Sequence, residues 1–275
     1  MKRFTGLLLI VLLSICFIGS AIAGEVLDKV LSKKLLVVAT APNWPPQAFL
    51  NENHEMDGFD VDVSREIAKR LGVKIEFVTP ALDMVVTGRW NGRWDLNVSS
   101  LTPTKKRAEV LSFPAIYYYT PVKFAVHKNS TYQSKADLNG KRIGVNYSST
   151  QEQYLKKTLE IDAIGVPKFT FDVTPGEIKT YESETFAFDD LRLGDGVRLD
   201  AVLASQTSLT NAAKHGYPIR ILDDFVFAEP LSITTDKGDV EFERKLTSIV
   251  NDMKREGTLR NLSMKWYGTD ITTLQ

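Results

Sequence analysis

Phe59 to Val98 reads FDVDVSREIAKRLGVKIEFVTPALDMVVTGRWNGRWDLNV, and its apolar residues alternate between helical and strand spacing. The pattern predicts a helix, a strand, a helix and a strand, over residues 59–71, 73–78, 82–90 and 94–98. Before this stretch, Lys34 to Thr40 is an apolar run of strand length. A strand–helix–strand–helix–strand order at this spacing indicates an α/β fold, with a parallel sheet and right-handed crossovers.

The same order returns between residues 141 and 222, which predicts a second α/β unit. Strands are expected over 141–145, 169–173, 199–203 and 219–222, helices over 150–159, 185–193 and 208–215, and an added hairpin over 174–181. Residues 117–126 and 225–232 cross between the units, as in a hinge that lets two lobes close on a ligand. We therefore predict two parallel or mixed sheets joined by a two-strand hinge. Lobe 1 would comprise residues 24–119 and 230–275, and lobe 2 residues 120–229.

The first 23 residues have the organisation of a secretory signal peptide. A positive start with Lys2 and Arg3 precedes an apolar run over residues 7–18, and Ala21-Ile22-Ala23 predicts cleavage after Ala23. An uncleaved membrane anchor is the alternative. We expect a soluble, exported, periplasmic protein.

Composition excludes several classes of function. Without Lys2 and Arg3, 32 of the 34 basic residues remain against 34 acidic ones, a net charge of about −2 that does not indicate nucleic-acid binding. The one cysteine, Cys16, lies in the predicted signal peptide, so the exported part would have no disulfide and no thiol chemistry. The three histidines lie outside the predicted cleft segments, so neither a metal site nor a cofactor is expected.

The segment from Ser99 to Arg107, SSLTPTKKR, directly follows a predicted strand. Ligands of open α/β sheets bind beyond the carboxyl ends of strands, so a ligand is expected here. The guanidinium of Arg107 matches a carboxylate or phosphate with two parallel hydrogen bonds. The alternative is that Arg107 starts a solvated helix beside Lys105 and Lys106.

Gly58-Phe59-Asp60-Val61-Asp62-Val63 resembles the signature of the family-3 periplasmic solute-binding proteins, the receptors of polar amino acid ABC transporters. The segment from Ser99 to Arg107 is similar to that family's carboxylate-binding segment. Lys237-Gly238-Asp239 and residues 252–268 resemble its carboxyl-terminal pattern. The resemblance implies a two-lobed periplasmic-binding-protein fold of type II, with the ligand in the cleft between the lobes.

The resemblance also implies a set of ligand-binding residues. The set is Trp44, Leu82, Ser100, Thr102, Arg107, Ser149, Thr150 and Ser205. Arg107 would bind a ligand carboxylate, helped by the backbone around Ser100 and the hydroxyl of Thr102. Ser149 and Thr150 would present a helix start to an anion, although Ser149 with a glutamate three residues later is also an ordinary capping box.

Two positions depart from the family pattern. Ser205 stands where the family usually has an acidic partner for the ligand ammonium, and Ala41 where relatives for cationic amino acids often have aspartate. A cationic amino acid is therefore not favoured, and a neutral or acidic amino acid or another small carboxylate is expected. Glu182 or Asp60 could replace the missing charge.

The aromatic residues near the predicted cleft divide into two groups. Trp44 lies between prolines and has no helical or strand period, so we expect it to face the ligand. Trp90 and Trp94 are expected to pack within a lobe. One of Tyr117, Tyr118 and Tyr119 could face the cleft.

Three function classes follow from these observations. The favoured one is a non-enzymatic, monomeric receptor that delivers a small-molecule ligand to an ABC permease in the inner membrane. The second is a cleft-based dehydratase similar to cyclohexadienyl dehydratase, because some relatives of this fold have become such enzymes. The third is the ligand-binding partner of a membrane sensor.

Overall fold

A nine-stranded mixed sheet runs through the computed structural model, which describes residues 24–273. Its strands are β1 (Leu35–Ala39), β5 (Lys74–Val78), β6 (Leu96–Leu101), β7 (Leu111–His127), β8 (Arg142–Asn146), β9 (Glu177–Tyr181), β10 (Ala201–Ser205), β11 (Ile219–Ile221) and β12 (Phe227–Asp236). Their order is β5-β1-β6-β12-β7-β10-β8-β9, and β11 pairs with β7. The predicted signal peptide lies outside the described residues.

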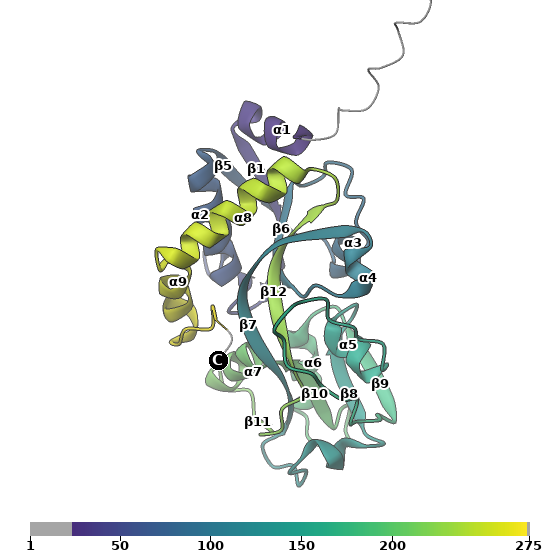
Figure 1. Ribbon diagram of the computed structural model, residues 1–275. Coiled ribbons are helices and arrows are strands. Elements are labelled where there is room, and N and C mark those ends of the chain that lie inside the picture. The colour runs from purple at the N-terminus through teal and green to yellow at the C-terminus, as the bar shows by residue number, and fades with distance from the viewer. Residues whose placement is uncertain (1–23, 274–275) are drawn as a thin grey trace, which may run out of the picture.

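The two ends of the sheet are parallel, as the sequence predicted, and the middle is antiparallel. β5, β1 and β6 are parallel neighbours, and so are β10, β8 and β9. Between them, β7 and β12 pair antiparallel with each other and run the length of the molecule (Figure 1). Because β12 also pairs with β6, and β7 with β10, the expected two sheets are joined into one.

Helices pack against the sheet in both lobes (Figure 1). They are α1 (Glu25–Lys33), α2 (Phe59–Leu71), α3 (Leu82–Val86), α4 (Lys105–Ala108), α5 (Thr150–Leu155), α6 (Glu184–Leu191), α7 (Gln206–Lys214), α8 (Val240–Arg255) and α9 (Thr258–Tyr267), with a short 3₁₀ helix over Lys135–Leu138. A small antiparallel sheet of β2 (Asn43–Trp44), β3 (Ala48–Leu50) and β4 (Met56–Asp57) lies apart from the main one.

Each lobe has its own apolar core. Two clusters draw only on residues before 119 and after 230, among them Val38, Phe59 and Phe242. The two others draw only on residues between 122 and 227. The clusters support 119/120 and 229/230 as proposed lobe boundaries.

Two expected helices are shorter than predicted. The helix predicted over 82–90 ends at Val86, because Gly88 and Arg89 have positive φ values of 65° and 54°. The helix predicted over 150–159 ends at Leu155, and Lys157 has a φ of 59°. A helix that was not predicted, α1, covers the polar residues before β1.

The predicted strand over 169–173 and the hairpin after it are wrong. Residues 177–181, assigned to the hairpin, form β9, which pairs with β8 along its whole length. Phe169 and Phe171 instead pack their rings against Tyr154, at centroid distances of 6.1 and 5.5 Å. An apolar aromatic run therefore covers the core as an irregular segment.

Candidate functional site

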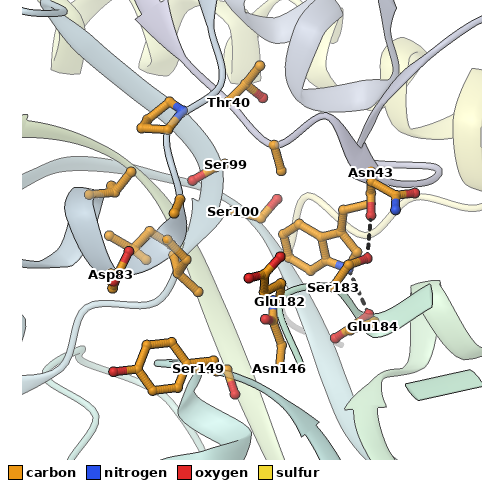
Figure 2. A pocket seen from close by; sticks show the side chains of 18 of the residues that line it. Thr40, Asn43, Asp83, Ser99, Ser100, Asn146, Ser149, Glu182, Ser183 and Glu184 are labelled. Carbon is orange, nitrogen blue, oxygen red and sulfur yellow. Dashed lines mark hydrogen bonds between the residues drawn. The ribbon is translucent and has the colours of Figure 1, made fainter. Parts of the chain in front are cut away.

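A cavity of about 570 Å³ lies between the lobes, where β1, β6 and β8 end. Seven of the eight predicted ligand-binding residues line it: Trp44, Leu82, Ser100, Thr102, Arg107, Ser149 and Thr150. Figure 2 shows Thr40, Ser99 and Ser100 on one side of the cavity, and Asn146, Ser149 and Glu182 facing them. The carboxyl ends of strands from both lobes thus form the cavity.

Ser205 is the exception and is not among the residues that line this cavity. It is 1% exposed and is the N-cap of α7, where its hydroxyl accepts a hydrogen bond from the Ser208 amide. The same hydroxyl contacts the hydroxyls of Thr207 and Ser208, both at 3.0 Å. The side chain serves the helix start.

Arg107 lies in α4 and is buried, with 5% of its surface exposed. Nη1 donates to the Thr102 carbonyl and Nη2 to the Ser148 carbonyl of lobe 2, each at 2.9 Å. Its Nε–H has no hydrogen-bond partner. Burial lowers the pKa of the guanidinium to about 10, against the opposing effect of Glu229, so the side chain is charged at neutral pH. The exposed-helix alternative for Arg107 is therefore wrong.

Glu229 is a buried carboxylate whose charge acts on the Arg107 guanidinium. It was not among the ligand-binding residues predicted from the sequence. It lies in β12 and accepts hydrogen bonds from Thr102 at 3.0 Å, from Gln151 at 3.1 Å and from Thr150. Thr102 belongs to lobe 1, and Thr150 and Gln151 to lobe 2. Burial raises the pKa of Glu229, and its hydrogen bonds and Arg107 oppose that rise. The Thr102 hydroxyl, expected to help bind a ligand carboxylate, already donates to this one.

The lobes touch on both sides of the cavity. On one side, Trp44 Nε1 donates to Glu184 Oε2 at 2.7 Å and to Ser208 Oγ at 2.8 Å. Gln47 Nε2 donates to Thr207 Oγ1 at 2.7 Å. On the other side, besides Arg107, Lys105 N donates to the Glu160 carbonyl at 3.0 Å and Asp162 N to the Pro103 carbonyl at 2.9 Å. The lobes are therefore closed around the cavity.

The loop that carries Trp44 is fixed by the start of α2. The amides of Phe59 and Asp60 donate to the carbonyls of Pro46 and Gln47, at 3.1 and 2.9 Å. Gly58 has a φ of 127°, and a Cβ there would lie 2.3 Å from the Gln47 carbonyl oxygen. Only glycine permits this approach, so the Gly58-Phe59-Asp60 motif sets the position of Trp44.

Four carboxylates and one guanidinium line the cavity. The acidic residues are Asp83, Glu182, Glu184 and Glu229, and the basic one is Arg107. Glu184 is 4% exposed, and burial raises its pKa to about 7 against hydrogen bonds from Ser208 and Trp44. Asp83 and Glu182 are exposed. The cavity therefore has an excess of negative charge that attracts a cation.

Two half-exposed aromatic side chains also line the cavity, from lobe 2. Tyr147 is 50% exposed and Phe186 49%. Leu82 and Pro80 line it from lobe 1. A ligand with an apolar or extended side chain would find contact surface here.

Asp60 lies behind the cavity wall and holds Ser100, which lines the cavity. Its carboxylate accepts hydrogen bonds from Tyr117 OH at 2.6 Å and Ser100 Oγ at 2.7 Å, and Tyr118 OH donates to Ser100 Oγ at 2.7 Å. Ser100 has a φ of 52°, and its amide donates to Tyr117 OH at 3.0 Å. Its amide and hydroxyl are thus occupied by this network. Asp60 is fully buried and is not a replacement for the missing acidic partner.

The Asp60 network makes stability depend on pH. Burial raises the pKa of Asp60 from 3.8 to about 7, so the folded state binds a proton that the unfolded chain releases. The free energy of unfolding should therefore fall as pH rises from about 4 to 7. Asp60→Asn, which is always neutral, should reduce that loss by roughly 3 kcal/mol. Denaturant titrations at pH 5 and 8 measure it.

The matched control is Asp195→Asn, because Asp195 is exposed in the turn after α6. It should leave the parent's pH dependence unchanged. The free energy of unfolding could instead fall by the same amount between pH 5 and pH 8 in Asp60→Asn and in the parent. That result would show that Asp60 is ionised in the folded state at both pH values.

The other aromatic predictions have clear outcomes. Trp90 and Trp94 pack together within lobe 1, with a ring-centroid distance of 5.3 Å, as expected. Tyr117 and Tyr118 are fully buried, and their hydroxyls join the Asp60 network. Tyr119 does not line the cavity.

Residues 24–273 contain neither a membrane-spanning helix nor a cluster of metal-ligating side chains. No helix there is long and apolar enough to cross a membrane. No group of three or more His, Cys, Asp or Glu side chains in the same range has the arrangement of a metal site.

Residues 36–269 match the model of the bacterial extracellular solute-binding proteins, family 3. The chain belongs to this family. The match covers most of both lobes and the whole set of residues around the cavity. As a family-3 protein, the chain is a solute-binding protein, and the relatives named for L-cystine and L-arginine are binding proteins as well.

Individual family-3 proteins resemble the chain along most of its length. The L-cystine-binding protein TcyJ of Escherichia coli (strain K12) is 25% identical over 249 residues, 90% of this chain and 87% of that protein. The L-arginine-binding protein of Pseudomonas aeruginosa is 28% identical over 238 residues, 83% of this chain and 86% of that protein. Among solved structures, the ancestral amino acid-binding protein AncCDT-1, a precursor of cyclohexadienyl dehydratase, has a TM-score of 0.76 and 28% identity. That match covers 88% of this chain and 99% of AncCDT-1.

Proposed function

We propose that this family-3 protein is the periplasmic receptor of an ABC importer and binds a polar amino acid that carries a positive charge in its side chain or a second ammonium group. The protein would act as a monomer after cleavage behind Ala23. The observation that carries the proposal is the charge of the interlobe cavity, where one guanidinium stands among four carboxylates. The relatives named for L-cystine and L-arginine support the same class.

This ligand class replaces the neutral or acidic one expected from Ser205 and Ala41. The earlier expectation rested on Ser205 and Ala41, two positions at which related receptors carry acids. In this chain, the carboxylates of the cavity come from other positions: Asp83 follows β5, Glu182 and Glu184 follow β9, and Glu229 lies in β12. An acidic ligand would add negative charge to them and is disfavoured.

Arg107 would receive the ligand carboxylate. In the structure its two Nη atoms donate to neutral backbone carbonyls. A carboxylate is a stronger acceptor than a carbonyl, so a ligand gains by taking over these donors and the unpartnered Nε–H. The ligand ammonium would lie toward Glu184 and Glu182, across the cavity.

Ligand binding would select the closed arrangement. The cavity walls come from both lobes, so a ligand that contacts both binds the closed form better than an open one. β7 and β12 are the strands that cross between the lobes, and closure would bend this two-stranded ribbon.

A thermal-shift screen tests the proposal with the protein from Gly24 onward. The panel is L-arginine, L-histidine, L-cystine, L-glutamine, L-glutamate and a dicarboxylate without an amino group. Stabilisation by the first three, and little or none by L-glutamate and the dicarboxylate, is expected. Stabilisation by the acidic compounds alone would contradict the charge argument.

Trp44→Phe should weaken binding of the best amino acid of the panel about tenfold, as measured by calorimetry. The variant keeps a ring against the cavity but loses the Nε1–H bonds to Glu184 and Ser208, which join the two lobes. Trp266→Phe is the control, because its indole binds Asp62 within lobe 1 and does not line the cavity. If Trp44→Phe binds the ligand as tightly as the parent, the hydrogen bonds of the indole do not contribute to ligand binding.

A further inference from the structure

A second cavity, of about 530 Å³, adjoins the first and shares Asn43, Trp44 and Glu184 with it. We call it the aromatic chamber and define it by Trp44, Phe49, Phe188, Tyr217, Trp266 and Glu184. Lobe 1 supplies the loop and strand with Trp44 and Phe49, and α9 with Trp266. Lobe 2 supplies α6, α7 and the residues after α7.

The chamber combines five aromatic rings with one buried carboxylate. Glu184 is 4% exposed, and its carboxylate accepts the hydrogen bond from Trp44. Among residues 24–273, no lysine or arginine lines the chamber. Aromatic walls around a negative charge attract organic cations, and Glu184 carries that charge above its pKa of about 7.

The neighbouring charges do not cancel that of Glu184. Lys265 Nζ lies 4.7 Å from the centroid of the Trp266 ring, but it is bound to Asp62 at 2.7 Å. His215 is exposed at the end of α7, and its Nδ1 contacts the Asn211 carbonyl at 2.8 Å. Glu229, on the side of the first cavity, adds further negative potential at Glu184.

We propose that the aromatic chamber is a second binding site of this protein, which takes a small organic cation of the quaternary ammonium class. The quaternary class follows from the hydrogen bonds already present. Glu184 already accepts hydrogen bonds from Trp44 and from Ser208, and the rings that define the rest of the chamber offer faces rather than acceptors to the other N–H groups of a primary ammonium. A quaternary ammonium has no N–H to satisfy and needs only charge and aromatic contact. The inference does not depend on which amino acid the first cavity takes, but the two sites share Trp44 and Glu184.

Choline and 3,3-dimethyl-1-butanol are matched probes, because they share size and shape and differ in charge. The readout is the set of indole N–H signals in a ¹⁵N-tryptophan spectrum of the protein from Gly24 onward. The chain has four tryptophans. Trp44 and Trp266 line the chamber, and Trp90 and Trp94 lie in the core of lobe 1 as internal controls.

Choline should shift the Trp44 and Trp266 signals saturably, at a concentration about tenfold lower than the alcohol requires. The Trp90 and Trp94 signals should not move. A shift of Trp44 without Trp266 would place the cation in the first cavity and overturn the proposal. Equal titrations by the two probes, or no shift of Trp266 with choline, would also overturn it.

A charge substitution at the rim gives a second, independent test. His215→Lys adds a positive charge beside the chamber on an exposed residue, and should weaken choline binding several-fold. Ala213→Lys adds the same charge two residues away, on an exposed position of α7 that does not line the chamber, and should leave choline affinity within twofold. Equal weakening by both variants would mean that choline is held only by general surface charge, which contradicts the proposed site.

Discussion

Arg107→Ala should weaken binding of the best amino acid of the panel by at least about 100-fold. The guanidinium is the one cation that lines the interlobe cavity of residues 24–273, so the variant leaves the ligand carboxylate among four acidic side chains. Two lost hydrogen bonds to a charged partner correspond to about 3 kcal/mol. Isothermal calorimetry of the purified variant measures the effect.

The control for Arg107→Ala is Lys106→Ala. Lys106 precedes Arg107 in α4 and is exposed, so removing it changes the net charge equally without changing the cavity. Its affinity should stay within twofold of the parent. If Arg107→Ala binds as tightly as Lys106→Ala, the carboxylate of the ligand is bound elsewhere.

Glu229→Ala should lower the free energy of unfolding by about 3 kcal/mol, because removing a buried anion leaves its partners unsatisfied. The side chains of Thr102, Thr150 and Gln151 would lose their common acceptor. Arg107 would lose the buried carboxylate whose charge raises its pKa. Chemical denaturation of the empty protein measures the change.

Glu229→Gln separates the charge of this side chain from its hydrogen bonds. The amide keeps one acceptor oxygen and should cost about 1 kcal/mol, so it provides a measurable variant if Glu229→Ala does not fold. Glu177→Ala, at an exposed position of β9, is the surface control. A loss of stability in Glu229→Ala no larger than in Glu177→Ala would show that the interlobe hydrogen bonds contribute nothing in solution.

The elements that the sequence predicted well are those in which periodicity and burial agree. The first strand–helix–strand unit is such a case, because Phe59, Val63 and Ile67 share the buried face of α2. Prediction failed where tertiary contacts override local pattern. Phe169 and Phe171 have strand-forming character, yet they pack on Tyr154 while β9 takes the place beside β8.

The candidate site was predictable in its position but not in its charge. Arg107 and its neighbours follow a strand end and a recognisable motif, so their place in the cavity could be inferred. Glu184 directly precedes the helix predicted over 185–193 and has no feature in the sequence that marks it as part of the site. Glu229 left one signal, since it is the one charged residue between Phe227 and Thr235. A lone charge in an apolar strand is costly to bury without partners, so its position indicates that hydrogen-bonding partners lie nearby.

The discontinuous core of lobe 1 has a consequence for how the chain folds as it is made. Phe59 and Val38 pack in one cluster with Leu231, Phe242 and Val250, which are synthesised far later. The core of lobe 2 comes from one uninterrupted stretch between residues 122 and 227. We therefore expect lobe 2 to be the first part able to fold during translation. The amino-terminal residues of lobe 1 can complete their core only after α8 has been synthesised. A ribosome that stalls before α8 would expose a chain whose first lobe lacks the buried residues of α8 and α9, and this is the stage at which a chaperone has most to bind.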